Sequence, residues 1–212
     1  MSATTWIGVV AIATAVLVWA EARERGAIAR PAKLSASAGF LALAWSQGAW
    51  THPSGRVLLL SLLACAVGDA CLLSRAPRWF LAGLSAFLLG HVGYAIAFAR
   101  DGASVGAVAI GTAILALPAA IVLRWLWPHV PAAMRAPVAA YVVAISVMVA
   151  AAWCCDAGGA TGWIRLGASA FYLSDLSVAR DVFIRRAWIN RAWGLPTYYA
   201  AQVCLALAAS PR

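Results

Sequence analysis

The chain has 212 residues, of which 64% are hydrophobic and only 11% are charged, and its mean hydropathy is +0.86. Because a soluble domain carries about 25% charged residues, this composition excludes an ordinary soluble enzyme or binding module and indicates a multi-pass membrane protein. The formal net charge of +9 does not indicate nucleic acid as a partner, since the basic residues lie in short segments between apolar runs, where they orient membrane spans.

Eight apolar segments follow one another along the chain, each close to the roughly 20 residues that cross a bilayer. We expect an all-α fold, a polytopic membrane helical bundle of eight transmembrane helices, as a single transmembrane domain over residues 1–212. Because the connections are short, helices consecutive in sequence should pack side by side. Most prolines lie at or beside the segment boundaries, and only Pro118 interrupts a segment. The expected spans are 4–20, 34–50, 57–74, 79–99, 104–126, 137–154, 162–179 and 195–209.

The basic residues alternate along the chain, and this alternation predicts the orientation. Twelve of the 16 Lys and Arg residues lie in or beside the connections that follow spans one, three, five and seven, and only four, including Arg212, lie on the opposite side. By the positive-inside rule, these four connections face the cytoplasm and both termini lie outside, in the cell (inner) membrane. The twelve are Arg23, Arg25, Arg30, Lys33, Arg75, Arg78, Arg124, Arg135, Arg180, Arg185, Arg186 and Arg191.

Two carboxylates lie inside the expected spans, Asp69 in the third and Asp175 in the seventh, whereas the other five acids lie at span ends or in connections. Each is about five residues, or roughly 7–8 Å, from the cytoplasmic end of its span. An ionised carboxylate deep in a membrane helix costs on the order of 2.5–3.5 kcal/mol. Two costly groups at the same depth predict a functional site. The alternative is a structural hydrogen-bonded pair joining the third and seventh helices.

Other polar and aromatic side chains reach a similar depth. Tyr198 and Gln202 are four residues apart and therefore share one face of the last span. A tyrosine near a span end is often an interfacial anchor, and a lone intramembrane histidine is often a packing residue, so a structural role stays open for each. The candidate substrate-binding residues in the spans are Tyr141, Phe171, Tyr172, Tyr198 and Gln202, with His91 and Tyr94 deeper in the fourth span.

The five cysteines do not form a recognisable framework. Their number is odd, most lie in apolar segments, and no CxxC spacing occurs, which argues against a disulfide scaffold or a zinc site. One histidine within the spans and two aspartates also make a poor zinc ligand set. The sequence therefore predicts neither a metal nor a cofactor.

Four motifs resemble those of a known family, the YhhN-like lysoplasmalogenases. The runs LLACAVGDACLL (62–73) and LAGLSAFLLGHVGYAIAF (81–98) resemble the family's GD and F-x-x-x-H-x-x-Y signatures. GASAFYLSDLSVA (167–179) is similar to its GA-x-x-F-x-x-SD segment, and LPTYYAAQ (195–202) to its Y-Y-x-A-Q pattern. The resemblance covers essentially the whole chain. One departure is Arg30-Pro31, where the family usually has Lys-Pro, although Lys33 follows closely.

This resemblance implies an enzyme, a lysoplasmalogenase, that hydrolyses the vinyl ether bond of lysoplasmalogens such as lysoplasmenylethanolamine or lysoplasmenylcholine. The products are a fatty aldehyde and a glycerophospho-alcohol. It implies a lysophospholipid substrate within membrane lipids, and it maps the family's essential acids onto Asp69 and Asp175. Arg30 or Lys33 would hold the substrate phosphate at the interface.

The chemistry of vinyl ethers suits two carboxyl groups. Hydrolysis begins with protonation of the alkene carbon, which gives an oxocarbenium ion that water then captures. One protonated carboxyl and one carboxylate divide this work as they do in glycosidases. The residues leave open which aspartate is the acid. They also leave open a membrane transporter or proton relay that uses the same acids, although no internal repeat supports it, and the oligomeric state is likewise open.

Overall fold

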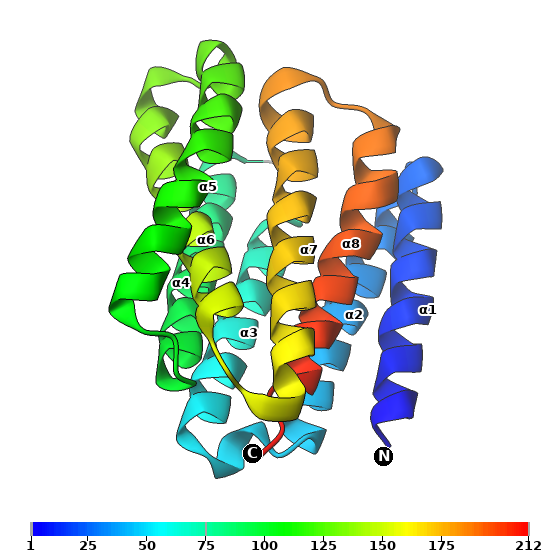
Figure 1. Cartoon of the computed structure of the whole chain (residues 1–212). Helices are drawn as coiled ribbons and strands as arrows, with labels where there is room; N and C mark the ends of the chain where they lie inside the picture. The colour runs from blue at the N-terminus through cyan, green and yellow to red at the C-terminus, as the bar shows by residue number, and fades with distance from the viewer. Residues whose placement is uncertain (1, 75, 212) are drawn as a thin grey trace.

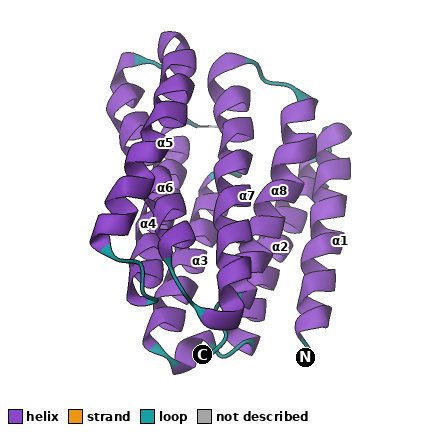
Figure 2. Cartoon of the chain, in the orientation of Figure 1, coloured by secondary structure: helices purple, strands orange, loops and turns teal. Residues whose placement is uncertain are grey.

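Every regular element in the computed structural model, which describes residues 2–74 and 76–211, is helical (Figure 2). The all-α prediction is confirmed, and each of the eight expected segments corresponds to one long helix. Arg75 and Arg212, which entered the charge alternation, lie outside the described residues. The long helices are α1 (Ala3–Ala22), α2 (Gly26–Ser46), α3 (Pro53–Cys71), α4 (Pro77–Arg100), α5 (Val105–Leu126), α6 (Ala132–Cys154), α7 (Thr161–Ala179) and α8 (Trp188–Leu207).

The helices run up and down between two ends of the bundle (Figure 1). Both termini lie at one end, and the α1–α2, α3–α4, α5–α6 and α7–α8 connections lie at the other. Each of these connections joins two helices that pack closely together. Helix α8 also packs against α1 and α2, and α7 packs against α6, so the first and last hairpins close the bundle on one side.

Helices α4 and α5 depart from the expected order of packing. The expectation that consecutive helices are spatial neighbours is wrong here, because α4 packs against α3 and α6, and α5 lies outside against α6. Along its length α5 buries only Ala119 and Leu126. Its outer surface is apolar and includes Ile110 and Leu117, each 66–70% exposed, which suits a helix in contact with lipid.

Helices α2, α6 and α8 begin five to eight residues earlier than expected. As a result Pro31, Pro137 and Pro196 lie inside helices, and the expectation that they mark boundaries is wrong. Each proline removes one backbone N–H, and the packed neighbouring helices tolerate this loss near the first turns. Pro53 and Pro77, by contrast, begin α3 and α4, where their missing N–H has no helical partner.

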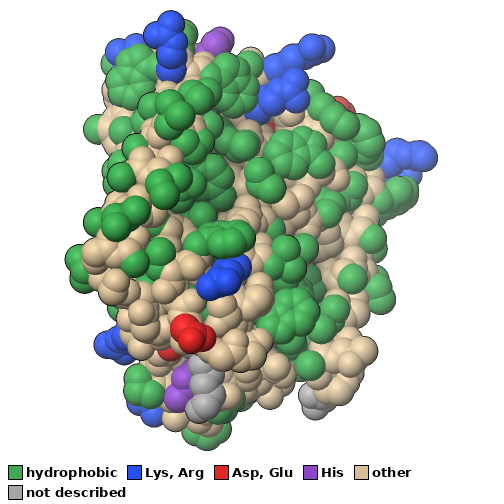
Figure 3. All heavy atoms as spheres, in the orientation of Figure 1, with side chains coloured by type: hydrophobic (Ala, Val, Ile, Leu, Met, Phe, Trp, Pro, Cys, Tyr) green, Lys and Arg blue, Asp and Glu red, His purple; other side chains and the backbone are tan. Residues whose placement is uncertain are grey.

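Five of the described helices, α1, α3, α4, α5 with its short extension to His129, and α6, are long and apolar enough to cross a membrane by length and composition. The other three, α2, α7 and α8, carry more polar side chains, and several of these point into the bundle, including Ser37, Asn190 and Gln202. Hydrophobic side chains cover much of the flank in Figure 3, and several Lys and Arg side chains project from the upper end. The chain is a multi-pass membrane protein.

Close packing of α3 on α4 depends on a glycine beside the first intramembrane acid. A Cβ built on Gly68 would lie 2.7 Å from the ring of Phe87, which is closer than real Cβ atoms approach. Phe87 in turn packs edge-on against Tyr198, with ring centroids 5.9 Å apart. The residue before Asp69 must therefore be small for α3 to approach α4.

Replacing Gly68 with Ala is expected to lower the stability of the purified protein by about 1–3 kcal/mol, because overpacking forces the Phe87 ring to move. The melting temperature in detergent measures this loss of stability. Gly106→Ala in α5 is the matched control, since a Cβ there meets open space and should not lower the melting temperature. Equal melting temperatures for both variants would contradict the packing argument.

Candidate active site

A cavity of about 1550 Å³ lies among the helices and reaches the end of the bundle that carries the α1–α2, α3–α4, α5–α6 and α7–α8 connections. Asp69 of α3 and Asp175 of α7 both line it. The two intramembrane acids therefore face one shared space from different helices. Five more of the candidate residues line the same cavity, namely Arg30, Lys33, Tyr141, Tyr172 and Tyr198.

Three donor groups, one ammonium and two hydroxyls, contact the Asp69 carboxylate. Its Oδ1 is 3.3 Å from Nζ of Lys33, and its Oδ2 accepts hydrogen bonds of 2.8 Å from the hydroxyls of Ser37 and Tyr198. Asp69 is 2% exposed, and the Lys33 side chain is 15% exposed. An ammonium group and two hydroxyl donors together compensate the negative charge of this buried carboxylate. This arrangement stabilises Asp69 as a carboxylate.

Asp175 has a different environment. Its Oδ2 accepts a hydrogen bond of 2.8 Å from the Tyr141 hydroxyl, and Nε2 of His91 lies 3.7 Å from the same oxygen, beyond hydrogen-bonding distance. Within the described residues, no Lys or Arg pairs with Asp175. Its side chain is 19% exposed, more than that of Asp69. Asp175 therefore lacks the cation that compensates Asp69, and little in its surroundings favours a permanent negative charge.

The hydrogen bonds of the two acids go to separate groups, since Asp69 bonds to α2 and α8, and Asp175 bonds to α6. The alternative expectation of a hydrogen-bonded Asp69–Asp175 pair between α3 and α7 is not what the structure contains. Both carboxylates instead line the cavity. Two carboxyl groups that share one cavity but have different partners are the arrangement that divides acid and base roles.

Four candidate residues lie behind the cavity wall rather than on it. The Tyr94 hydroxyl donates a 2.9 Å hydrogen bond to Oε1 of Gln202, and both side chains are fully buried. His91 is also fully buried, with its ring centroid 4.6 Å from that of Phe171 and 5.0 Å from that of Tyr141. Phe171 packs against Tyr198 at 5.3 Å. These residues can hold the tyrosines that bind the two acids, but they do not reach the cavity.

A family model described as the YhhN family matches residues 28–209, which include α3 to α8 and all but the first two residues of α2. The chain belongs to the YhhN family. No solved structure shows significant similarity to it.

Curated relatives of this YhhN protein carry the name lysoplasmalogenase. Lysoplasmalogenase TMEM86A of Bos taurus is 32% identical over 169 residues, which cover 75% of this chain and 67% of that protein. Lysoplasmalogenase TMEM86B of Sus scrofa is 36% identical over 151 residues, covering 71% and 62%. A lysoplasmalogenase of Mycobacterium bovis is 36% identical over 193 residues, covering 84% and 69%. The alignments thus span about two thirds of the length of these relatives.

Arg30 and Lys33, the two residues predicted to bind the substrate phosphate, have different positions in this YhhN protein. Arg30 is exposed and lines the cavity, whereas the ammonium of Lys33 faces Asp69. Lys33 is therefore the counter-ion of Asp69, and Arg30 stays the candidate of the two for the predicted phosphate contact. Within the described residues, no three His, Cys, Asp or Glu side chains lie close enough together to hold a metal ion.

Sequence reasoning missed Ser37, which donates a hydrogen bond to Asp69. The signal was present, because Ser37 follows Lys33 by four residues and such residues share one helix face. It also missed the hydroxyl of Tyr199, which donates to the Lys33 carbonyl at 3.3 Å and fixes α2 against α8. A lone lysine near the start of an apolar segment is the feature that would have directed attention to both.

Proposed function

We propose that this YhhN-family protein is a lysoplasmalogenase that hydrolyses the vinyl ether bond of lysoplasmalogens with Asp69 and Asp175 as its two catalytic carboxyl groups. The observation that carries the proposal is that the two acids line one large cavity from α3 and α7 and have different partners. The names of the curated relatives support the substrate class.

In the proposed reaction, a carboxylic acid gives its proton to the alkene carbon that is not bonded to oxygen. The electron pair of the double bond forms the new C–H bond and leaves an oxocarbenium ion. Water attacks that ion and loses a proton to give a hemiacetal, which breaks down to a fatty aldehyde and the glycerophospho-alcohol. Water is the only co-reactant. The second carboxylate takes up the proton from water, and the cycle closes when that proton returns to the first carboxyl group through water in the cavity.

We assign the acid to Asp175 and the carboxylate to Asp69. The Lys33 ammonium and the hydroxyls of Ser37 and Tyr198 stabilise the charged form of Asp69, which then stabilises the oxocarbenium ion and accepts the proton of the attacking water. Asp175 has no such cation within the described residues, so it is the group better suited to carry a proton to the alkene.

Tyrosines complete the proposed site. Tyr141 donates a hydrogen bond to Asp175 and orients its carboxyl group toward the cavity. The hydroxyl of Tyr172 is buried and has no hydrogen-bond partner within the described residues, and the side chain lines the cavity. A buried hydroxyl of this kind is available to a substrate oxygen, such as that of the ether or of the neighbouring free hydroxyl.

In the proposed topology all eight helices cross the cell (inner) membrane, with both termini outside. The four connections at the open end of the cavity hold or adjoin twelve of the 16 Lys and Arg residues, which supports a cytoplasmic position. Helices α2, α7 and α8 have 19 to 21 residues, enough to span the bilayer, and several of their polar side chains are buried in the bundle, including Ser37, Ser174 and Gln202. A lysolipid would then enter from the cytoplasmic leaflet.

The test follows the release of aldehyde and of fatty acid by the purified protein from three lysolipids that differ only at the first glycerol carbon. The vinyl ether is expected to be hydrolysed, and the saturated ether and the ester are not, because neither has an alkene to protonate. In heavy water, the released aldehyde should carry one deuterium on the carbon next to the carbonyl group, measured by mass spectrometry after immediate reduction. Ester hydrolysis, or an aldehyde without deuterium, would refute the mechanism. Proton-coupled uptake into liposomes without aldehyde release would instead support the transporter alternative.

A further inference from the structure

The mouth of the cavity holds more basic than acidic groups. Four acids line the cavity, Glu21, Asp69, Asp175 and Asp181. Five Lys and Arg side chains line it as well, Arg30, Lys33, Arg185, Arg186 and Arg191. Lys33 is paired with Asp69 deep in the cavity, so the balance at the mouth depends on the other groups.

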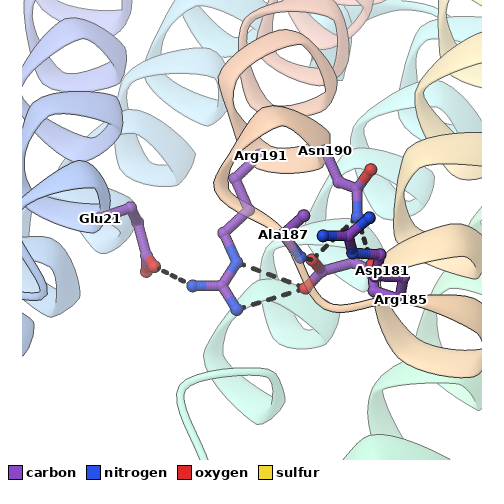
Figure 4. Close-up of polar contacts among 6 residues, drawn as sticks. All are labelled: Glu21, Asp181, Arg185, Ala187, Asn190 and Arg191. Atoms are coloured by element: carbon purple, nitrogen blue, oxygen red, sulfur yellow. Dashed lines mark hydrogen bonds and ion pairs between the residues drawn. The ribbon is translucent and has the colours of Figure 1, made fainter.

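Arg191 pairs with both acids at the mouth. Its guanidinium contacts Glu21 at the end of α1 and, through Nη2 at 3.2 Å, Asp181 in the α7–α8 connection (Figure 4). The other oxygen of Asp181 accepts a 3.1 Å hydrogen bond from Nδ2 of Asn190. One arginine of α8 thus links α1 to the α7–α8 connection by pairing with both acids, and the four arginines at the mouth still outnumber these two acids.

The α7–α8 connection is held in a defined shape by the same network. Helix α7 continues into a π-helical turn, Arg180–Ile184, and the chain is then extended at Arg185. Oδ1 of Asp181 accepts a 3.0 Å hydrogen bond from the backbone N–H of Ala187, and Asn190 donates to the carbonyl of Arg185 at 2.8 Å. Two successive arginines, Arg185 and Arg186, are therefore presented on an ordered segment at the cavity edge.

Three arginines at the mouth are left without an acidic partner. Within the described residues, no ion pair involves Arg30, Arg185 or Arg186, and all three are exposed. They line the cavity from two elements, the first turns of α2 and the α7–α8 connection. An apolar part of the cavity wall comes from α5, α6 and the π-helical turn, and includes Val122, Leu126, Met134, Val138 and Phe183. The cavity thus combines a cationic group of side chains with an apolar wall near the same end of the bundle.

We propose that Arg30, Arg185 and Arg186 form a binding site for the phosphodiester of the substrate, with the hydrocarbon chain in the apolar part of the cavity. This inference rests on the proposed function. A phosphodiester carries one negative charge on two free oxygens, and guanidinium groups bind such oxygens in bidentate, charge-assisted hydrogen bonds. Holding the phosphate at the mouth places the bond next to the first glycerol carbon deeper in the cavity, in the direction of the two acids.

The test measures binding, so that it does not depend on turnover. Radiolabelled alkyl lysophosphatidylethanolamine, a saturated ether that cannot be hydrolysed, is bound to purified protein in nonionic detergent and followed by scintillation proximity. Alkylglycerol, which lacks the phosphate, is the paired ligand. The double variant R185Q/R186Q and the single variant R30Q are compared with R78Q, which changes an exposed arginine at the same end of the bundle that does not line the cavity.

R185Q/R186Q is expected to weaken binding of the phosphate-bearing ligand by roughly tenfold or more, and R30Q by several fold, with alkylglycerol binding unchanged in both. R78Q should change neither. Equal losses for both ligands, or no loss for the phosphate-bearing ligand, would overturn the proposal. Displacement of the labelled lysolipid by added diacyl phosphatidylglycerol would also overturn it, because the arginines would then bind the phosphate of bulk membrane lipid. A wild-type protein that binds the phosphate-bearing ligand but releases no aldehyde would refute the proposed function and leave this site intact.

Discussion

Replacing Asp175 with Asn is expected to lower kcat for lysoplasmalogen hydrolysis by about 1000-fold, because an amide has no acidic proton to give to the alkene carbon and general acids typically supply 10²–10⁴-fold. Replacing Asp69 with Asn should have an effect of similar size, because the oxocarbenium ion loses its counter-charge and water loses its base. The measurement is the rate of aldehyde release by purified protein, coupled to enzymatic reduction of the aldehyde.

Stability separates a catalytic role from a structural one. Asn is nearly isosteric with Asp and still accepts the Tyr141 hydrogen bond, and no cation is left unpaired at Asp175. We therefore expect Asp175→Asn to keep its melting temperature within a few degrees of wild type. Asp156→Asn is the matched control, since Asp156 is exposed in the α6–α7 connection, away from the cavity. Wild-type kcat in Asp175→Asn would refute the assignment, and loss of folded protein in that variant alone would support a scaffold role.

Formate distinguishes the acid from the carboxylate. The variant Asp69→Ala leaves space for a small anion beside the ammonium of Lys33, and the cavity is large enough to admit it. Formate should therefore restore part of the activity of Asp69→Ala. It should not restore Asp175→Ala, because formate is ionised near neutral pH and has no proton to donate. The reverse pattern would exchange the two roles.

The sequence predicted that the two acids face the same end of the bundle, because each lies near the end of an apolar segment that runs in the same direction, and both acids do line one cavity. The same pattern predicted the eight helices, since each apolar run is bounded by charges, glycines or prolines. The packing of α5 was not predictable. The sequences of α5 and α6 are similarly apolar, but α6 buries many residues in the bundle, whereas α5 lies at its surface. Hydropathy cannot separate them, because lipid and protein interior are both apolar surroundings.

The pairing of Lys33 with Asp69 was missed for a different physical reason. Pro31 and the nearby charges favoured a span that starts at residue 34, which places Lys33 at the membrane surface. In the structure α2 begins at Gly26, so Lys33 is about two turns into the helix and its ammonium reaches the acid. In a sequence, a proline and a charged residue usually indicate the end of a membrane span. Here packing against neighbouring helices allows Pro31 inside α2, and the buried carboxylate of Asp69 compensates the charge of Lys33.

Replacing Lys33 with Met is expected to destabilise the protein by about 3–5 kcal/mol, because it leaves the carboxylate of Asp69 buried without a cation. The melting temperature in detergent should fall accordingly, and kcat should fall as well, because the cation that stabilises the charged form of Asp69 for the reaction is gone. Arg30→Met is the control for stability. It removes a cation from the preceding turn of α2, but that cation is exposed and has no ion-pair partner within the described residues.

The double variant Lys33→Met with Asp69→Asn decides whether the two side chains act as a pair. Removing both charges leaves no uncompensated group in the bundle, so most of the lost stability should return while activity stays as low as in Asp69→Asn. If the double variant is as unstable as the sum of the two single variants, the ammonium and the carboxylate do not interact, and Lys33 cannot be what keeps Asp69 charged. If stability returns together with activity, Asp69 is not part of the chemistry. Only recovery of the fold without recovery of turnover fits a carboxylate held ionised for the reaction by a lysine on the neighbouring helix.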